Sequence, residues 1–275
     1  MQQTVCLVYG MVVNEYLDLI ERTLDAVIPQ ARPEVLFSAM RYAVGTGGKR
    51  IRPLVCLASA VAVGGKAEDA KYPAAAIELL HNYTLVHDDL PAMDNDRERR
   101  GKPTVWVKFG EANAILAGDA LLALAYQVAA KAPRNVAAIV DVLGEKGVGV
   151  VQGQVEDIRR ETSDGSRVSS LKSSDIEFIY GHKTADLFIA AAAMGALAGG
   201  GSDESVATLK FFALQLGMAF QLEDDLLDGD SPFSREETEQ RIAFCTNAAV
   251  AALDLLPGDV TFLRELAQKL VGRKV

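Results

Sequence analysis

Two clusters of aspartates are the residues of this sequence best suited to chemistry. The first contains Asp88, Asp89 and Asp94, and the second contains Asp224, Asp225 and Asp228. Asp224 and Asp228 would share one face of a helix, where two carboxylates about 4 Å apart repel by about 4 kcal/mol in an effective dielectric of about 20. Magnesium relieves such repulsion, because it binds one or two carboxylates together with waters and phosphate oxygens. The clusters therefore predict magnesium ions held on a diphosphate substrate.

The alternative for each cluster is a solvated acidic helix end. Both clusters end a mostly apolar helical pattern, and their first aspartates lie 224 − 88 = 136 positions apart. This repetition favours a shared role over two unrelated acidic ends. Asp88 and Asp94 are six positions apart with Pro91 between them, so their spacing leaves open whether they point the same way.

Basic residues gather at three places that could bind an anion. Lys49 and Arg52 follow Gly47-Gly48 just before a predicted helix, where backbone N–H groups and cationic side chains together make an anion site. Residues 97–100, Arg-Glu-Arg-Arg, follow the first aspartate cluster, and Lys183 precedes Thr184 at a junction of predicted helices. The alternatives are an ordinary turn with basic residues and a solvated charge run.

The composition excludes several classes of protein. The net charge is −9 and no basic stripe is present, so nucleic acid is not an expected partner. The three cysteines are far apart and lack metal-ligand or redox spacing, and the N-terminus lacks the basic start of a signal peptide. The longest weakly polar run, 187–201, is shorter than the roughly 20 residues that span a bilayer. We expect a cytoplasmic protein without a membrane segment.

Helical periodicity runs through almost the whole chain, and no alternating run is long enough for a sheet. No linker or low-complexity stretch divides the sequence. We therefore predict an all-α fold, a single domain over residues 1–275 with roughly ten or more helices. The expected helices cover residues 12–27, 34–44, 53–63, 74–89, 111–130, 135–160, 173–181, 186–197, 203–227, 235–255 and 259–271.

The order of these motifs resembles the trans-isoprenyl diphosphate synthases over roughly residues 34–230, most closely the bacterial farnesyl diphosphate synthases and their geranylgeranyl relatives. The resemblance implies an all-α bundle around a central cavity, usually a homodimer. It also implies head-to-tail condensation of isopentenyl diphosphate with an allylic diphosphate, with three magnesium ions. The segments that carry it are Gly-Gly-Lys-Arg-Ile-Arg-Pro at 47–53, His-Asn-Tyr-Thr-Leu-Val-His-Asp-Asp-Leu-Pro-Ala-Met-Asp at 81–94, Arg-Arg-Gly-Lys-Pro-Thr at 99–104, residues 110–121, His-Lys-Thr at 182–184, and Phe-Gln-Leu-Glu-Asp-Asp-Leu-Leu-Asp at 220–228.

The resemblance also implies a role for individual residues. Asp88 and Asp94 would bind two metals and Asp224 the third, supported by Asp89, Asp225 and Asp228. The expected contacts to the allylic substrate are Arg99, Lys183, Thr184 and Gln221, and Phe220 is a further expected substrate-binding residue. The expected isopentenyl diphosphate site consists of Lys49, Arg52, His81 and Arg100. For His87 and His182, hydrogen-bonding partners of nearby groups are a better interpretation than catalysts.

Product length is expected to depend on the residues before Asp88. Tyr83 and Thr84 lie five and four positions before it, and Tyr83 would point into the cavity if Asp88 does. A bulky aromatic there, with the two-residue insertion Pro91-Ala92, resembles the farnesyl synthases and implies a floor that stops a C15 chain. The alternatives are plain core packing for Tyr83 and a geranylgeranyl product.

The chain departs from the family after Asp228. The family continues with a glycine- and lysine-containing loop, whereas here Gly229 leads through Ser234 directly to Arg235, and the first lysine after Lys210 is Lys269. A weakly active or non-catalytic synthase subunit is therefore an alternative, unless the C-terminal residues 271–275 cover the site instead. A terpene cyclase is a third possibility, although it needs no second diphosphate site.

Overall fold

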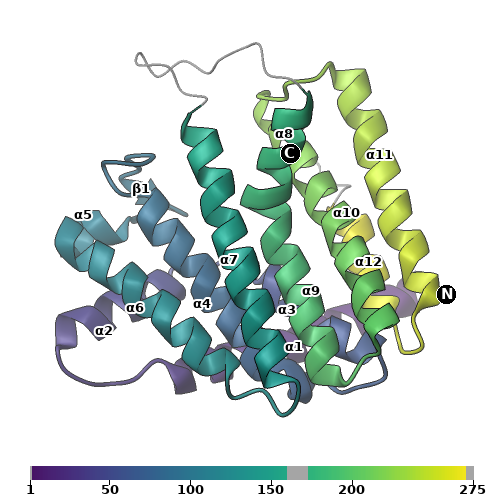
Figure 1. Ribbon diagram of the computed structural model, residues 1–275, viewed down its shortest axis with the longest axis horizontal. Helices are drawn as coiled ribbons and strands as arrows, with labels where there is room; N and C mark the ends of the chain where they lie inside the picture. Colours follow the sequence, from purple (N-terminus) through teal and green to yellow (C-terminus); the bar gives the residue numbers. More distant parts are fainter. Residues whose placement is uncertain (1, 160–172, 271–275) are drawn as a thin grey trace.

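Helices make up almost all regular structure of the protein (Figure 1). The computed structural model describes residues 2–159 and 173–270, with side chains from residue 10 onward. The α-helices are α1 Gln2–Val27, α2 Glu34–Gly45, α3 Ile51–Ala62, α4 Lys71–Asp88, α5 Val105–Phe109, α6 Glu111–Ala129, α7 Val136–Ile158, α8 Ser173–Ile179, α9 Asp186–Gly199, α10 Asp203–Asp228, α11 Arg235–Ala252 and α12 Thr261–Leu270. Short helical turns, η1 Ala67–Ala70 and η3 Leu253–Leu255, adjoin α4 and α11.

Helix α9 lies at the centre of the bundle because its sequence is apolar on every side. Every residue from Asp186 to Gly199 except Leu197 is buried. The helix packs against α3, α4, α7 and α10, which surround it. The two helices that end in aspartates, α4 and α10, are therefore held against one common core.

Local signals define both ends of α10. At its start, the Ser202 side chain accepts a hydrogen bond from the Ser205 backbone N–H at 3.2 Å, which satisfies an otherwise unpaired donor of the first turn. At its end, Gly229 has φ +78°, the left-handed conformation that closes many helices. Ser234 caps the next helix in the same way, through the Glu237 N–H. The connection between α10 and α11 is thus short and closed by caps on both sides.

The predicted all-α architecture is confirmed, and most helix bounds agree with the expected ranges, although α1 begins at Gln2, ten residues before its expected start. Residues 135–160 were expected to form one helix or two, and α7 is a single helix there. Three features were not predicted: the short helix α5, the two-residue strands β1 Glu98–Arg99 and β2 Lys102–Pro103, and the π-helix η2 Tyr180–Ala185. Each is too short to show a periodic pattern in the sequence.

Two helices, α6 and α10, have the length and hydropathy of a membrane span. Helices that pack in the core of a bundle have the same properties, and α6 packs against α4 while α10 packs against α9 and α11. This finding is weak evidence, and the absence of a membrane segment stays a prediction. Residues 271–275, which were expected to offer a substitute cover for the site, lie outside the described residues.

Candidate active site

The first aspartate cluster is formed by a tight turn after α4. The Asp94 backbone N–H donates to the Asp88 carbonyl at 2.8 Å, which folds the segment with Pro91 back onto the helix end. The pKa of Asp88 is raised to about 7, chiefly by burial; Lys183 opposes this shift, and the charge of Asp94 contributes to it. Asp88 and Asp94 therefore lie in one electrostatic environment, which their sequence spacing had left open.

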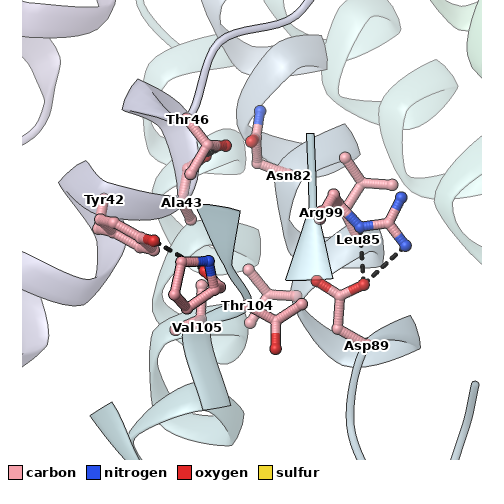
Figure 2. Close-up of a pocket in the computed structure, with 11 residues that line it drawn as sticks. Tyr42, Ala43, Thr46, Asn82, Leu85, Asp89, Arg99, Thr104 and Val105 are labelled. Atoms are coloured by element: carbon pink, nitrogen blue, oxygen red, sulfur yellow. Dashed lines mark hydrogen bonds and ion pairs between the residues drawn. The ribbon is translucent and has the colours of Figure 1, made fainter. Parts of the chain in front are cut away.

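Asp89 points away from these two carboxylates. Its side chain is buried, and its Oδ1 accepts from Arg99 Nε at 2.7 Å and forms an ion pair with the second Arg99 nitrogen at 2.6 Å. Figure 2 shows this pair at a small cavity between α4, α2 and the β1–β2 hairpin. Asp89 thus anchors Arg99 and the hairpin, and its expected support of the metal ligands stays a prediction.

The hairpin directs two arginines to different places. Arg100 and Gly101 have φ of +55° and +73°, and this pair of left-handed residues makes the tight turn between β1 and β2. Arg99 contacts Asp89, whereas Arg100 donates to the Gly47 carbonyl. The Arg-Arg pair therefore connects the first aspartate cluster to the glycine-rich turn before α3.

The π-helix η2 places Lys183 and Thr184 beside the aspartates. Lys183 Nζ pairs with Asp157 of α7, and its charge lowers the pKa of both Asp88 and Asp94. The close approach of α7 depends on Gly153, since a Cβ there would lie 2.3 Å from the Lys183 backbone nitrogen. Lys183 is thus a cation surrounded by three carboxylates, as a diphosphate-binding lysine beside metal ligands should be.

The second cluster is connected to η2 by a chain of hydrogen bonds. The Thr184 hydroxyl donates to Gln221 Oε1, and Gln221 Nε2 donates to Asp225 Oδ1 at 2.7 Å. The Tyr180 hydroxyl donates to the other oxygen of Asp225. Asp225 therefore orients Gln221 and Thr184, two of the predicted substrate contacts.

Asp224 lies near enough to Arg52 of α3 for its charge to act on it. The pKa of Arg52 is lowered to about 10, chiefly by burial, while Glu78 and Asp224 oppose that shift. Asp228, one turn further along α10, is exposed, whereas Asp224 is partly buried.

The four residues predicted for the isopentenyl diphosphate site line one cavity of about 600 Å³, together with Phe220. An Arg52 terminal nitrogen lies 3.2 Å from His81 Nε2, while Arg52 Nε and His81 Nδ1 are buried without partners. Burial, followed by Arg52 and Arg100, holds the pKa of His81 well below 6.5. The predicted site residues gathered in this cavity are Lys49, Arg52, His81 and Arg100.

Arg50 belongs to the same basic segment but has a structural role. It is buried and donates to Glu21 at 2.8 Å, to Glu78 at 2.7 Å and to the Val44 carbonyl at 2.8 Å. Arg50 is the residue immediately before α3, and it has a left-handed φ of +49°. Because Arg50 is fully neutralised, the positive charge of the cavity comes from its neighbours Lys49 and Arg52.

A second cavity of about 370 Å³ is mostly apolar and contacts the first one through Arg52 and His81, which line both. Asp88, Lys183 and Thr184 line it, and so do Tyr83 and Thr84. The Tyr83 ring packs edge-on to His87 at 4.9 Å between centroids, and His87 Nε2 lies 3.0 Å from the Ile115 carbonyl. Tyr83 therefore does reach the cavity that Asp88 lines, and His87 has a partner, as predicted.

The oxygen donors around this cavity fit magnesium. Among the described residues, no three His, Cys, Asp or Glu side chains converge as a complete metal-ligand set. Magnesium does not require one, because substrate phosphate oxygens and waters complete its shell. Burial raises the pKa of both Asp88 and Asp94, which marks carboxylates in need of a counter-charge.

Some residues of the site had no signal in the sequence. Asp157 and Gln154 of α7 line or contact the site, and Tyr180 bonds Asp225. The pattern of residues 135–160 predicted helical structure and assigned no role to the polar residues within it. A search of that helix for polar side chains on its most apolar face would have found Gln154 and Asp157.

The helical bundle, the two acidic clusters and the paired cavities are together typical of the isoprenoid diphosphate synthases. Comparisons with known proteins agree with this class. The polyprenyl synthetase family matches residues 33–243. The chain is 42% identical over 222 residues to the heterodimeric geranylgeranyl pyrophosphate synthase large subunit 1 of Arabidopsis thaliana, which covers 77% of this chain and 58% of that protein. The chain belongs to the polyprenyl synthetase family.

Solved structures show the same fold over nearly the whole chain. An FPP/GFPP synthase from Zymomonas mobilis has a TM-score of 0.86 at 31% identity, covering 99% of this chain and all of that one. The geranylgeranyl pyrophosphate synthetase from Pyrococcus horikoshii has a TM-score of 0.86 at 28% identity, covering 97% and 98%. The chain spans 57–60% of the length of several curated plant relatives.

Proposed function

We propose that the protein is a prenyltransferase that condenses isopentenyl diphosphate with an allylic diphosphate, dimethylallyl or geranyl, head to tail. The observation that carries this proposal is the pair of adjoining cavities. One is lined by Lys49, Arg52, His81 and Arg100, and the other by Asp88, Lys183 and an apolar wall. Glu78 also lines the first cavity, but it is paired with Arg50. An excess of basic side chains suits a bare diphosphate, whereas acids beside a lysine suit a diphosphate that arrives with metal ions.

The reaction follows from what each cavity holds. The C1–O bond of the allylic diphosphate breaks and its electron pair leaves with the diphosphate. The double bond of isopentenyl diphosphate, held next to Arg52 and His81, then forms a carbon–carbon bond to the allylic cation. A proton is lost from the new chain to the departing diphosphate, which balances the charge. Lys183 binds the leaving diphosphate and Thr184 borders the reacting carbon.

Magnesium would be held by Asp88 and Asp94 on one side and by Asp224 on the other, as three ions. When bound, it neutralises the leaving diphosphate as a Lewis acid. The side chains themselves prepare this site, since Asp89 fixes Arg99 and Asp225 fixes Gln221 without occupying the cavity.

The product is proposed to be farnesyl diphosphate, C15, because the Tyr83 ring lines the apolar cavity and His87 supports it. A C20 geranylgeranyl product is the second candidate. It is favoured by the similarity to plant proteins named geranylgeranyl pyrophosphate synthases and to the Pyrococcus horikoshii structure named geranylgeranyl pyrophosphate synthetase.

Two other functions are tested by the same experiment. A terpene cyclase is disfavoured by the basic cavity, which a single-substrate reaction does not use. A weakly active subunit is favoured by the short connection 229–234, which carries no lysine where the family has a basic loop.

The experiment incubates purified protein with magnesium, isopentenyl diphosphate and, separately, dimethylallyl, geranyl or farnesyl diphosphate. Condensed prenyl diphosphate identified by mass spectrometry supports the proposal. Hydrocarbon from a single allylic substrate supports the cyclase. Magnesium-dependent diphosphate binding without turnover supports the non-catalytic subunit. Asp88→Asn is the matched control and should abolish condensation.

We also propose that the protein works as a homodimer in the cytoplasm. Apolar side chains are exposed along α6 and α7: Ile115, Leu116, Val148, Val151 and Val155 are each at least 44% exposed. Val151 and Val155 also line the apolar cavity. A second copy covering this face would close the outer wall of that cavity and remove the exposed apolar surface from water.

A further inference from the structure

Gln154 is a buried amide that has no partner. Its side chain is 8% exposed, and neither Oε1 nor Nε2 makes a hydrogen bond. Among the described residues, it has two unpaired buried side-chain atoms where Arg52, Ser59, His81 and Gln215 have one each. Burying an unpaired amide is unfavourable, so a native structure that keeps one calls for a ligand.

The amide borders the apolar cavity rather than the protein core. Its neighbours along the same wall are Val150, Val151 and Leu187, which carry no polar side-chain atoms. Asp88 and Lys183 line the same cavity at the end where the diphosphate is proposed to bind. Gln154 is thus a polar group on the wall that faces the hydrocarbon part of the substrate.

The depth of Gln154 follows from its position on α7. Asp157 lies three residues later on the same helix and pairs with Lys183, at the level of the diphosphate. A helix rises 1.5 Å per residue, so Gln154 lies about 4.5 Å from Asp157 along the axis of α7. Of the two residues, Gln154 is the one that lines the cavity, beside the part that would hold the first carbons of an allylic chain.

We propose that Gln154 is a further catalytic residue, whose Oε1 faces the allylic carbons and stabilises the positive charge that develops on them. The inference rests on the proposed prenyl transfer. No bond forms to Gln154: the C1–O bond breaks with its electrons going to the diphosphate, and the carbonyl dipole acts on the cation until the new carbon–carbon bond forms.

An amide suits this task better than a carboxylate would. A carboxylate on this wall would attract a proton or a metal ion, whereas a neutral carbonyl keeps its dipole at any ordinary pH. Beside an apolar wall, such a fixed dipole acts through a lower dielectric than that of water. Asp157 and Gln221 are less suited to this task, because Asp157 binds Lys183 and Gln221 Oε1 accepts from Thr184.

The test compares Gln154→Met with Gln152→Met in the full chain. Gln152 lies on the exposed side of the same helix, so the control makes the same chemical change outside the cavity. We expect Gln154→Met to lower kcat roughly ten- to a hundredfold, less than the loss of a full oxyanion-hole donor, and to leave KM for isopentenyl diphosphate unchanged. Its melting temperature should rise by roughly 2–4 °C, because an unpaired buried amide is removed. Gln152→Met should change neither quantity.

Three results would overturn the inference. An unchanged kcat for Gln154→Met would show that the amide does not act on the cation. Weaker binding of inorganic diphosphate to Gln154→Met would show that the amide acts on the leaving group and not on the cation. A melting temperature below that of the unmodified protein would make the amide structural. If the unmodified protein condenses no substrate, the proposed function fails before any variant is compared, so the two failures are distinguishable.

Discussion

At the scale of the residue, the site consists of carboxylates that differ in their partners. Asp89 and Asp225 are engaged by Arg99 and by Gln221, and burial raises the pKa of Asp88, Asp89 and Asp94. Asp88 lines the apolar cavity, whereas Asp89 and Asp225 orient Arg99 and Gln221, two of the expected substrate contacts.

Tyr83 is the first residue whose substitution tests this view. Tyr83→Ala should give longer prenyl products, by one or more C5 units, because the ring that borders the apolar cavity is removed while Asp88 is untouched. Mass spectrometry of the product mixture measures the change. Tyr126→Ala is a matched control, since that ring is not among those lining the cavity. An unchanged product length for Tyr83→Ala would contradict the proposed floor.

His81 should make the stability of the protein dependent on pH. Burial and Arg52 hold its pKa well below 6.5 in the folded state, while the unfolded chain has the ordinary value. Below pH 6.5 the unfolded state therefore binds more protons, so the free energy of unfolding falls as the pH falls. Chemical denaturation of the metal-free protein between pH 7.5 and about 5 should show this loss, and His81→Asn should reduce its slope. Equal slopes for both proteins would contradict the assignment.

At the scale of the element, the π-helix η2 determines the position of Lys183 and Thr184. Asp186, at the start of α9, is buried and binds His182 Nδ1 at 2.7 Å and Lys146 Nζ at 3.1 Å. The widened turn is thereby fastened at its end to α7. His182 thus has a hydrogen-bonding partner, as the sequence predicted. That partner, Asp186, helps to position η2 and with it Lys183 and Thr184.

Asp186→Asn should separate this role from general stability. Losing one charge of a buried network should destabilise the fold by about 2 kcal/mol and raise KM for the allylic diphosphate more than KM for isopentenyl diphosphate. Glu145→Gln is the matched control, because the exposed Glu145 binds the same Lys146 at 3.0 Å and should cost less than about 1 kcal/mol. Equal changes in both KM values would limit Asp186 to a structural role.

At the scale of the whole molecule, helices α6 and α7 together expose several large apolar side chains. Figure 1 shows α6 and α11 at opposite sides, with the core helices α9 and α10 between them. Leu116 on α6 is 56% exposed and Val148 on α7 is 61% exposed. A homodimer through this face would bring two apolar cavities close to one interface.

Leu116→Glu should disrupt such a dimer. A charge placed in an apolar interface is left without a partner, so the variant should sediment as a monomer at concentrations where the unmodified protein is a dimer. Phe244→Glu on α11 is the matched control, since that ring is 71% exposed and lies on the opposite side. Analytical ultracentrifugation measures both. A dimer that survives Leu116→Glu would contradict the proposed face.

The long helices were predictable because each carries an apolar period over several turns, and α9 because it is apolar throughout. The hairpin and the π-helix were not predictable. Two strands of two residues and one widened turn are too short to produce a periodic pattern of apolar residues. The same limit applies to Gln154 and Asp157, which look like surface residues of a helix until α7 is packed against η2.

The sequence by itself determined the all-α fold, the family and the charge of each part of the site, because these depend on residue types and on order along the chain. Only the tertiary structure decided which carboxylates face the cavity. Asp94 reaches Asp88 through a backbone turn, and Asp225 is drawn to Tyr180 across 45 positions. Such contacts depend on how helices pack in three dimensions, and spacing within one helix carries no information about them.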